Sequence, residues 1–390
     1  MSSPALNDPE VEEFGPPDVD SRIPAWIWNW LPLLIGIGLA VLLQAILPKA
    51  VGIYNSRIVM DIAIAMILAV SLNIVNGMTG QFSIGHAGFM TVGGYAAGMI
   101  SYYGSYFLLG NADRHAGWFA PGEWIFAVSC LAGGLVAAAA GYLVGLPSLR
   151  LRGDYLAIVT LGFGEIVRVL LQQTGRVLDS AEQVRSATWQ QWRTVPVGGA
   201  VGFDGVPKYT NLFWVYLFLT ITVVVAYRLK QSSLGRAMIS IREDEIAAQA
   251  MGVNIARQKV LAFVLAAFFA GIAGGLIAHE SGVILSPKDA GFQRSFDFVI
   301  MTVLGGRGSI SGVMVAAIFV TALPEMLRDF ESYRLIVFAL LLIIMMLVRP
   351  QGLFGIHEIW HLFGHRKQNA SSGKTDTTVA AASTRGGGSR

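Results

Sequence analysis

The chain contains 390 residues, of which 54% are hydrophobic and only 14% are charged, and its net charge is +3. Soluble globular proteins average about 25% charged residues, so this sequence cannot coat the surface of a water-soluble fold of its size. The single cysteine, Cys130, excludes an intrachain disulfide and a cysteine-based metal centre. Since helices satisfy their own backbone groups in lipid, the composition predicts an all-α integral membrane protein.

Residues 1–25 form an acidic, proline-bearing segment, which we expect to lie in the cytoplasm. No basic region precedes Trp26, so the first apolar stretch is predicted to be a retained span rather than a cleavable signal peptide. The transmembrane domain is predicted over residues 26–355. Residues 356–390 are predicted to be a cytoplasmic tail, first amphipathic and then disordered.

Within 26–355, apolar stretches of about 20 residues recur, which is the length that a spanning helix needs. Charge-free stretches lie within 22–49, 61–113 (enough for two helices), 123–150, 208–228 and 259–280. Residues 155–171 are also long enough, and 296–348 is apolar but interrupted twice. The pattern predicts about ten spans (8–10).

Orientation follows from the basic residues of the short loops. The richest loop is 228–259, with six lysines and arginines, so we place it in the cytoplasm. Both termini are then predicted to be cytoplasmic, and the long loop 172–211 extracytoplasmic.

Two glycine-rich segments, 79–89 and 305–312, interrupt apolar sequence in different halves of the chain. Broken helices at membrane depth are tolerated where they are buried in protein or line a water-filled path, and paired interruptions are typical of transport routes. An alternative is that both are ordinary tight turns. The transport interpretation places the substrate pathway at six residues: Gln81, Ser83, His86, Gly305, Gly306 and Ser309.

Two ionisable residues inside an apolar stretch, Glu165 and Arg168, are three positions apart and can pair on one helical face. Ionisable groups in a span face protein or water. A structural pair and a substrate contact both remain open for them.

The cytoplasmic loop contains a short segment, 240–252, in which acids precede alanines and Gly252 is a natural helix stop. Such a surface helix suits docking to a soluble partner. A solvated connector is the alternative.

Ordered blocks from about residue 59 to 355 resemble the M-type permease subunit of bacterial branched-chain amino-acid ABC importers. The matching blocks include Gly80-Gln81-x-Ser83-x-Gly85-His86-Ala87, the stretch from Arg150 to Ile166, Leu304-Gly305-Gly306-Arg307-Gly308-Ser309 and Arg349-Pro350-Gln351-Gly352. Ala247-Ala248-x-x-x-Gly252 is similar to the coupling-loop motif of ABC importer permeases, although Ile246 stands at its glutamate position. Urea-importer permeases are close relatives, and a permease for urea or another small solute is the alternative.

The resemblance implies a non-enzymatic permease in the bacterial inner membrane, with a second, H-type permease, two cytoplasmic ATPases and a periplasmic amino-acid-binding protein as partners. It implies ATPase coupling through Arg242, Glu243, Glu245, Ala247, Ala248 and Gly252. The chain contains no phosphate-binding loop, since Gln368 stands where Gly373-Lys374-Thr375 would need its first glycine. We therefore expect no cofactor or metal in this chain, with ATP and Mg²⁺ bound by the partner ATPases.

One motif belongs to another class of protein. His357-Glu358-Ile359-Trp360-His361 fits the H-E-x-x-H pattern of zinc proteases. The apolar residues between these positions favour an interfacial amphipathic helix instead, which leaves a membrane metalloprotease as a remote alternative.

Overall fold

The computed structural model describes residues 25–50, 52–111, 120–148, 154–328, 333–348 and 352. Helices dominate this part of the chain, and its only β-type pairings are isolated bridges, Gly175 with Pro196 and Phe203 with Leu285. The all-α prediction is confirmed. The proposed tail helix and the H-E-x-x-H motif lie outside the described residues.

The α-helices, in chain order, are α1 (Ala25–Ala50), α2 (Gly52–Asn73), α3 (His86–Leu108), α4 (Pro121–Ser148), α5 (Asp154–Gln172), α6 (Ala181–Ser186), α7 (Trp189–Arg193), α8 (Leu212–Gln231), α9 (Ser233–Glu243), α10 (Glu245–Ala250), α11 (Ile255–Ala278), α12 (Phe292–Gly305), α13 (Ile310–Met326) and α14 (Arg334–Val348). A π-helical turn, η1 (Ile74–Met78), extends α2, and short 3₁₀ turns lie at η2 (Gly199–Val201) and η3 (Pro287–Ala290).

Among the described residues, six helices are long and apolar enough to cross a membrane, namely those over Trp30–Ala50, Gly52–Met78, Pro121–Leu146, Tyr155–Gln172, Leu212–Gln231 and Ile255–Ala278. Helix α13 is apolar but shorter. The chain is therefore a multi-pass membrane protein, and the count of ten spans stays a prediction.

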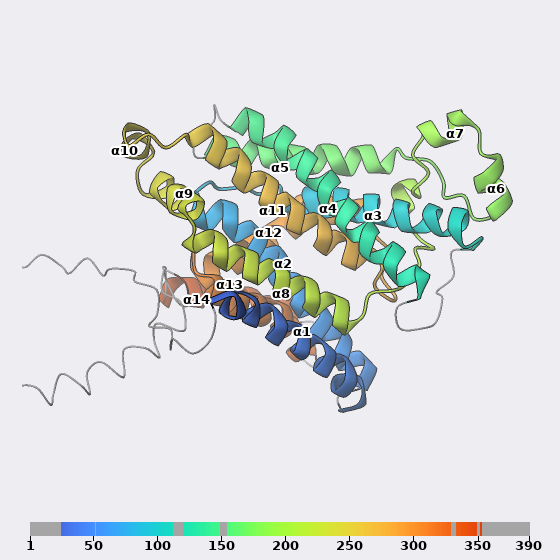
Figure 1. Ribbon diagram of the computed structural model, residues 1–390, viewed down its shortest axis with the longest axis horizontal. Helices are drawn as coiled ribbons and strands as arrows, with labels where there is room; N and C mark the ends of the chain where they lie inside the picture. The colour runs from blue at the N-terminus through green and yellow to red at the C-terminus, as the bar shows by residue number, and fades with distance from the viewer. Residues whose placement is uncertain are drawn as a thin grey trace, which may run out of the picture.

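The long helices run between two ends of the molecule (Figure 1). One, which we call the α10 end, carries α9 and α10, and the opposite, α7 end carries α6 and α7. Helices α2 and α11 are the most buried of the long spans, whereas α1 is largely exposed and lies along α8. Helix α11 packs against α3 and α4, so these three helices form the centre of the bundle.

Glycines allow the central helices to approach closely. A Cβ on Gly274 of α11 would lie 1.8 Å from the Met90 carbonyl oxygen of α3, and one on Gly93 would lie 2.2 Å from the Cα of Gly271. Only glycine lets helix backbones touch in this way.

Two parts of the chain have the same arrangement of a long helix, a turn and a second helix, but they run in opposite directions. Helix α2 runs toward the α10 end, the chain turns back through 79–85, and α3 starts in the interior and runs to the α7 end. Helix α11 runs toward the α7 end, the chain turns back through 279–291, and α12 starts beside α3, where the Ala87 N–H donates to Ser295 Oγ at 3.1 Å. Inverted repeats of this kind are common in transporters.

This plan differs from the pairing that the sequence suggested. The counterpart of 79–85 is 279–291, which has no run of glycines, and Gly305–Ser309 is the turn between α12 and α13. The sequence pattern could not reveal that 79–85 corresponds to 279–291, because this match depends on which helices start in the interior of the bundle.

Candidate functional site: the Arg242 junction and the α10 surface

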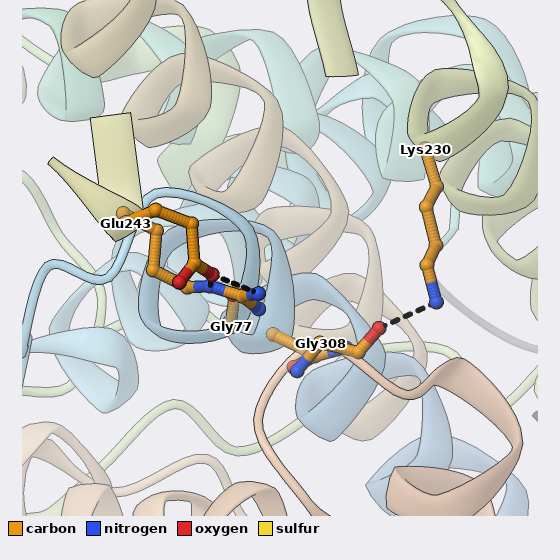
Figure 2. Close-up of polar contacts among 6 residues, drawn as sticks. Gly77, Lys230, Glu243 and Gly308 are labelled. Carbon is orange, nitrogen blue, oxygen red and sulfur yellow. Dashed lines mark hydrogen bonds and ion pairs between the residues drawn. The ribbon is translucent and has the colours of Figure 1, made fainter. Parts of the chain in front are cut away.

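Four segments meet at the α10 end around the side chain of Arg242. Its Nη1 donates to the Gly77 carbonyl oxygen at 2.9 Å, and its Nη2 donates to Glu243 Oε1 at 2.6 Å. Lys230 Nζ at the end of α8 donates to the Gly308 carbonyl oxygen at 2.8 Å (Figure 2). Asn73 Oδ1 on α2 accepts from the Gly308 N–H at 2.9 Å. We call these five residues, Asn73, Gly77, Lys230, Arg242 and Gly308, the Arg242 junction.

Small residues make the junction possible. A Cβ on Gly77 would lie 2.5 Å from the Gly308 backbone nitrogen, and one on Gly80 would lie 2.8 Å from Arg242 Cγ. Gly80 also has a φ of 70°, which side chains disfavour. The guanidinium thus reaches the Gly77 carbonyl oxygen directly, and charge-assisted bonds of this kind are about twice as strong as neutral ones.

Beyond the junction, α9 and α10 form a bent unit. Asp244 ends α9 and caps α10, with its Oδ1 accepting from the Ile246 N–H at 2.8 Å and the Ala247 N–H at 3.0 Å. Gly252 has a φ of 84°, so the predicted helix stop has the left-handed backbone that glycine favours. The sequence segment 240–252 is therefore two helices joined at Asp244.

The short α10 helix is fixed to α11 and presents an apolar tip. Glu245 Oε1 pairs with the buried Lys259 Nζ at 2.9 Å, and Ala248 is buried. Ile246 and Met251 are 73% and 85% exposed. A hollow of about 440 Å³ lies beside them between α10 and the start of α11, lined by Glu245, Gln249, Val253, Asn254, Ile255, Ala256 and Lys259. Exposed apolar side chains next to a hollow suit a protein partner.

The six residues predicted for the pathway lie in the packed interior and fall into two groups. His86 Nε2 lies 2.8 Å from Ser71 Oγ, and the Ser83 N–H donates to Asn76 Oδ1 at 3.1 Å. Gly305, Gly306 and Ser309 lie at the α12–α13 turn, where Asn73 Nδ2 donates to the Ser309 carbonyl oxygen at 3.4 Å. Both glycine-rich segments thus reach the junction: a Cβ on Gly80 of the first would lie 2.8 Å from Arg242 Cγ, and Gly308 of the second belongs to the junction. Their transport role stays a prediction.

Buried amides mark this interior region. The side-chain oxygen and nitrogen of Gln81 and the Nδ2 of Asn76 are buried and find no hydrogen-bond partner within the described part of the chain. Such groups are rare in native proteins, and each calls for a physical reason. Two residues that the sequence interpretation missed, Asn73 and Lys230, carried a signal: an amide within an apolar run, and a lysine at a span end.

The long loop 172–211 is ordered against the end of α3 by tyrosines. Tyr103 Oη donates to the Pro196 carbonyl oxygen at 2.6 Å, and Tyr102 Oη donates to that of Leu178 at 3.1 Å. Tyr106 Oη similarly donates to Asp179 at 3.1 Å. The surface of the α7 end is therefore formed by a loop that hydrogen bonds hold in place.

The inverted helix plan, the buried spans and the loop helices held at one end define a polytopic membrane permease. Residues 54–347 match the family described as the permease component of branched-chain amino acid transport systems. The chain belongs to this family.

Curated relatives agree with this match. The chain is 38% identical over 318 residues to the high-affinity branched-chain amino acid transport system permease protein LivM of Escherichia coli, covering 76% of this chain and 70% of that protein. It is 24% identical over 297 residues to LivH of Salmonella typhimurium, covering 75% and 92%. With BraD of Pseudomonas aeruginosa it shares 31% identity over 150 residues, 38% of this chain and 48% of the relative. The stronger likeness to LivM confirms the predicted M-type resemblance.

Proposed function

We propose that this chain is the M-type membrane subunit of an ATP-driven importer that moves leucine, isoleucine and valine across the bacterial inner membrane. The match over residues 54–347 and the names of the relatives LivM, LivH and BraD support the substrate class. Urea, the alternative, appears in none of these names.

The same relatives support the partners that we propose. Likeness to both LivM and LivH supports pairing with a second, H-type permease. We place two ATPase subunits at the α10 end, which is then cytoplasmic with both termini, and the periplasmic binding protein at the α7 end. ATP and Mg²⁺ belong to the ATPases, because a permease supplies movement rather than hydrolysis.

One observation carries the coupling proposal: the apolar tip of α10 is exposed, and α10 directly follows α9, whose Arg242 belongs to the Arg242 junction. Ile246 and Met251 are available to a partner. Within the same unit, Arg242 donates to Gly77 at the end of η1, and it also lies against Gly80 and Gly308 of the two glycine-rich segments. An ATPase that moves α10 would therefore also move the ends of η1 and α12. Rigid-body switching of a permease needs such a connection.

Reconstituted transport tests the function. The chain is assembled in proteoliposomes with its H-type permease, ATPases and binding protein, and uptake of labelled leucine and labelled urea is measured with ATP or a non-hydrolysable analogue. We expect leucine uptake that requires hydrolysis and this chain. Urea uptake in place of leucine uptake would show that the substrate is urea. Leucine uptake without any ATPase would contradict the ABC mechanism.

A further inference from the structure

Glu165 and Arg168 lie deep in α5 yet remain accessible. Glu165 is about 15 Å along the helix from Tyr155 and about 10 Å from Gln172, at 1.5 Å per residue, so it lies well inside a hydrocarbon core of about 30 Å. Arg168 Nε and Glu165 Oε2 are 2.6 Å apart, and the two side chains are 35% and 36% exposed. Charges at this depth face protein or water, never lipid.

The pair is built into the start of α12. Glu165 Oε1 accepts from the Phe292 N–H, the first of α12, at 3.3 Å. A Cβ on Gly164 would lie 3.0 Å from the Ala290 carbonyl oxygen, and one on Gly291 would lie 3.7 Å from Arg168 Cδ. The chain before α12 therefore passes directly over the ion pair, and the positive end of the helix dipole adds to the field there.

Exposed residues of α12 continue the same surface. Phe292 and Phe296 are 49% and 41% exposed, four positions apart on one side of the helix. Arg294 is exposed on the other side, and its charge acts on Asp297 and, on neighbouring α2, on Asp61. We call the set Glu165, Arg168, Phe292 and Phe296 the α5–α12 face.

A membrane-depth surface of this composition matches a zwitterion with an apolar side chain. Bringing both an ammonium and a carboxylate to this depth is costly unless each meets an opposite charge. The ion pair offers one of each sign, and the neighbouring aromatic rings offer apolar contact. Glu165 and Arg168 already pair with each other, so a ligand that binds them replaces one ion pair with two similar ones. The free energies of the free and bound states are then close, which suits a site that must also release its ligand.

We propose that the α5–α12 face is a passage site for the transported amino acid, in which Glu165 receives the α-ammonium, Arg168 the α-carboxylate, and Phe292 and Phe296 the aliphatic side chain. This inference rests on the proposed function. It places the substrate on an exposed face of this chain rather than among the buried residues around His86.

The first test measures the accessibility of the site to water. Because the chain has a single cysteine, replacing it leaves no other thiol to react. In a Cys130→Ala background, Gln293→Cys puts a thiol at an exposed position next to Phe292 of the α5–α12 face, and Leu135→Cys puts one on the exposed apolar side of α4 as a control. In the assembled importer, a charged, membrane-impermeant thiol reagent should label the Gln293→Cys variant, and saturating leucine should slow labelling several-fold. The Leu135→Cys variant should not react. No labelling at position 293, or labelling indifferent to leucine, would overturn the site.

Transport is the second test. Glu165→Gln and Arg168→Gln should each lower leucine uptake at least tenfold while ATP hydrolysis stimulated by the binding protein persists. A purely structural pair would lower both activities together. Wild-type uptake rates in these variants would refute this site alone, whereas absence of leucine uptake by the wild-type importer would refute the proposed function itself. If the variants fail to assemble, the labelling test decides.

Discussion

At the scale of single residues, one carboxylate at the α7 end is held away from water. Glu280 lies two residues after α11, its side chain is 2% exposed, and Arg57 Nε lies 3.2 Å from its Oε1. Burial is the largest cause that raises the pKa of Glu280 to about 7, the charge of Asp61 adds to the rise, and Arg57 opposes it. The folded state therefore favours the protonated form.

The raised pKa predicts a pH-dependent stability. The contribution of protonated Glu280 is complete below its unfolded pKa of 4.5 and is lost as pH rises through about 7. Glu280→Gln, which stays neutral, should lose less thermal stability than the wild type between pH 5 and pH 8, by on the order of 1–3 kcal/mol. Melting curves of the purified protein measure this.

Glu243→Gln is the matched control, because it removes an exposed carboxylate and reports the general effect of losing one negative charge. Parallel pH profiles for the Glu280→Gln variant and the wild type would show that the Glu280 carboxyl is not buried in the folded protein.

At the scale of elements, close crossings position α3 and α11. Their backbones touch at Gly274 and Met90, and at Gly93 and Gly271, without intervening side chains. A fixed crossing there also fixes where α3 begins, and therefore the position of His86 and of the neighbouring start of α12.

Gly274→Ala should destabilise the protein, since its Cβ would meet the Met90 carbonyl oxygen and the backbones would have to separate. Overpacking of this kind costs about 1–3 kcal/mol. Gly104→Ala on α3 is the control, because nothing lies within 4 Å of its Cβ and alanine favours helix. We expect a lower melting temperature for the first variant and an equal or higher one for the second; equal values for both would contradict the tight crossing.

Much at this scale was predictable. Charge-free stretches located the long spans because a membrane imposes length and composition together. The division of 240–252 at Asp244 was not predicted, since an acidic residue can extend a helix start or cap a new one. The break at 279–291 also went unrecognised, because Ser286 and Pro287 carry only a local turn signal. The sequence also did not predict which side of Glu165 and Arg168 is accessible, because this depends on how α12 packs against α5.

At the scale of the whole molecule, the Arg242 junction joins the α9–α10 unit to both inverted parts. Arg242 contacts the end of η1 through Gly77, and Lys230 contacts the α12–α13 turn through Gly308. We therefore expect a movement of α10 to reach the end of η1 and the α12–α13 turn through only a few contacts.

Arg242→Ala should disconnect this path. The loss of a charged hydrogen bond to a buried carbonyl oxygen costs about 1.5–3 kcal/mol, so we expect leucine uptake to fall at least tenfold while the importer still assembles and hydrolyses ATP. Arg236→Ala on the same helix is the control, since Arg236 is exposed and contacts only Gln231 of its own segment among the hydrogen bonds described. Its uptake should stay within about twofold of the wild type. Equal uptake by both variants would remove Arg242 from coupling.

Within the junction, Arg242 and Lys230 donate to the main-chain oxygens of Gly77 and Gly308, and every amino acid supplies such an oxygen. Arg242 and Lys230 therefore require small neighbours at positions 77, 80 and 308 rather than particular side chains. Both cations lie in the loop 228–259. We therefore expect that a loop from another permease can replace it when that loop brings the same two cations at the same spacing. Such an exchange would need no redesign of the helices around the junction.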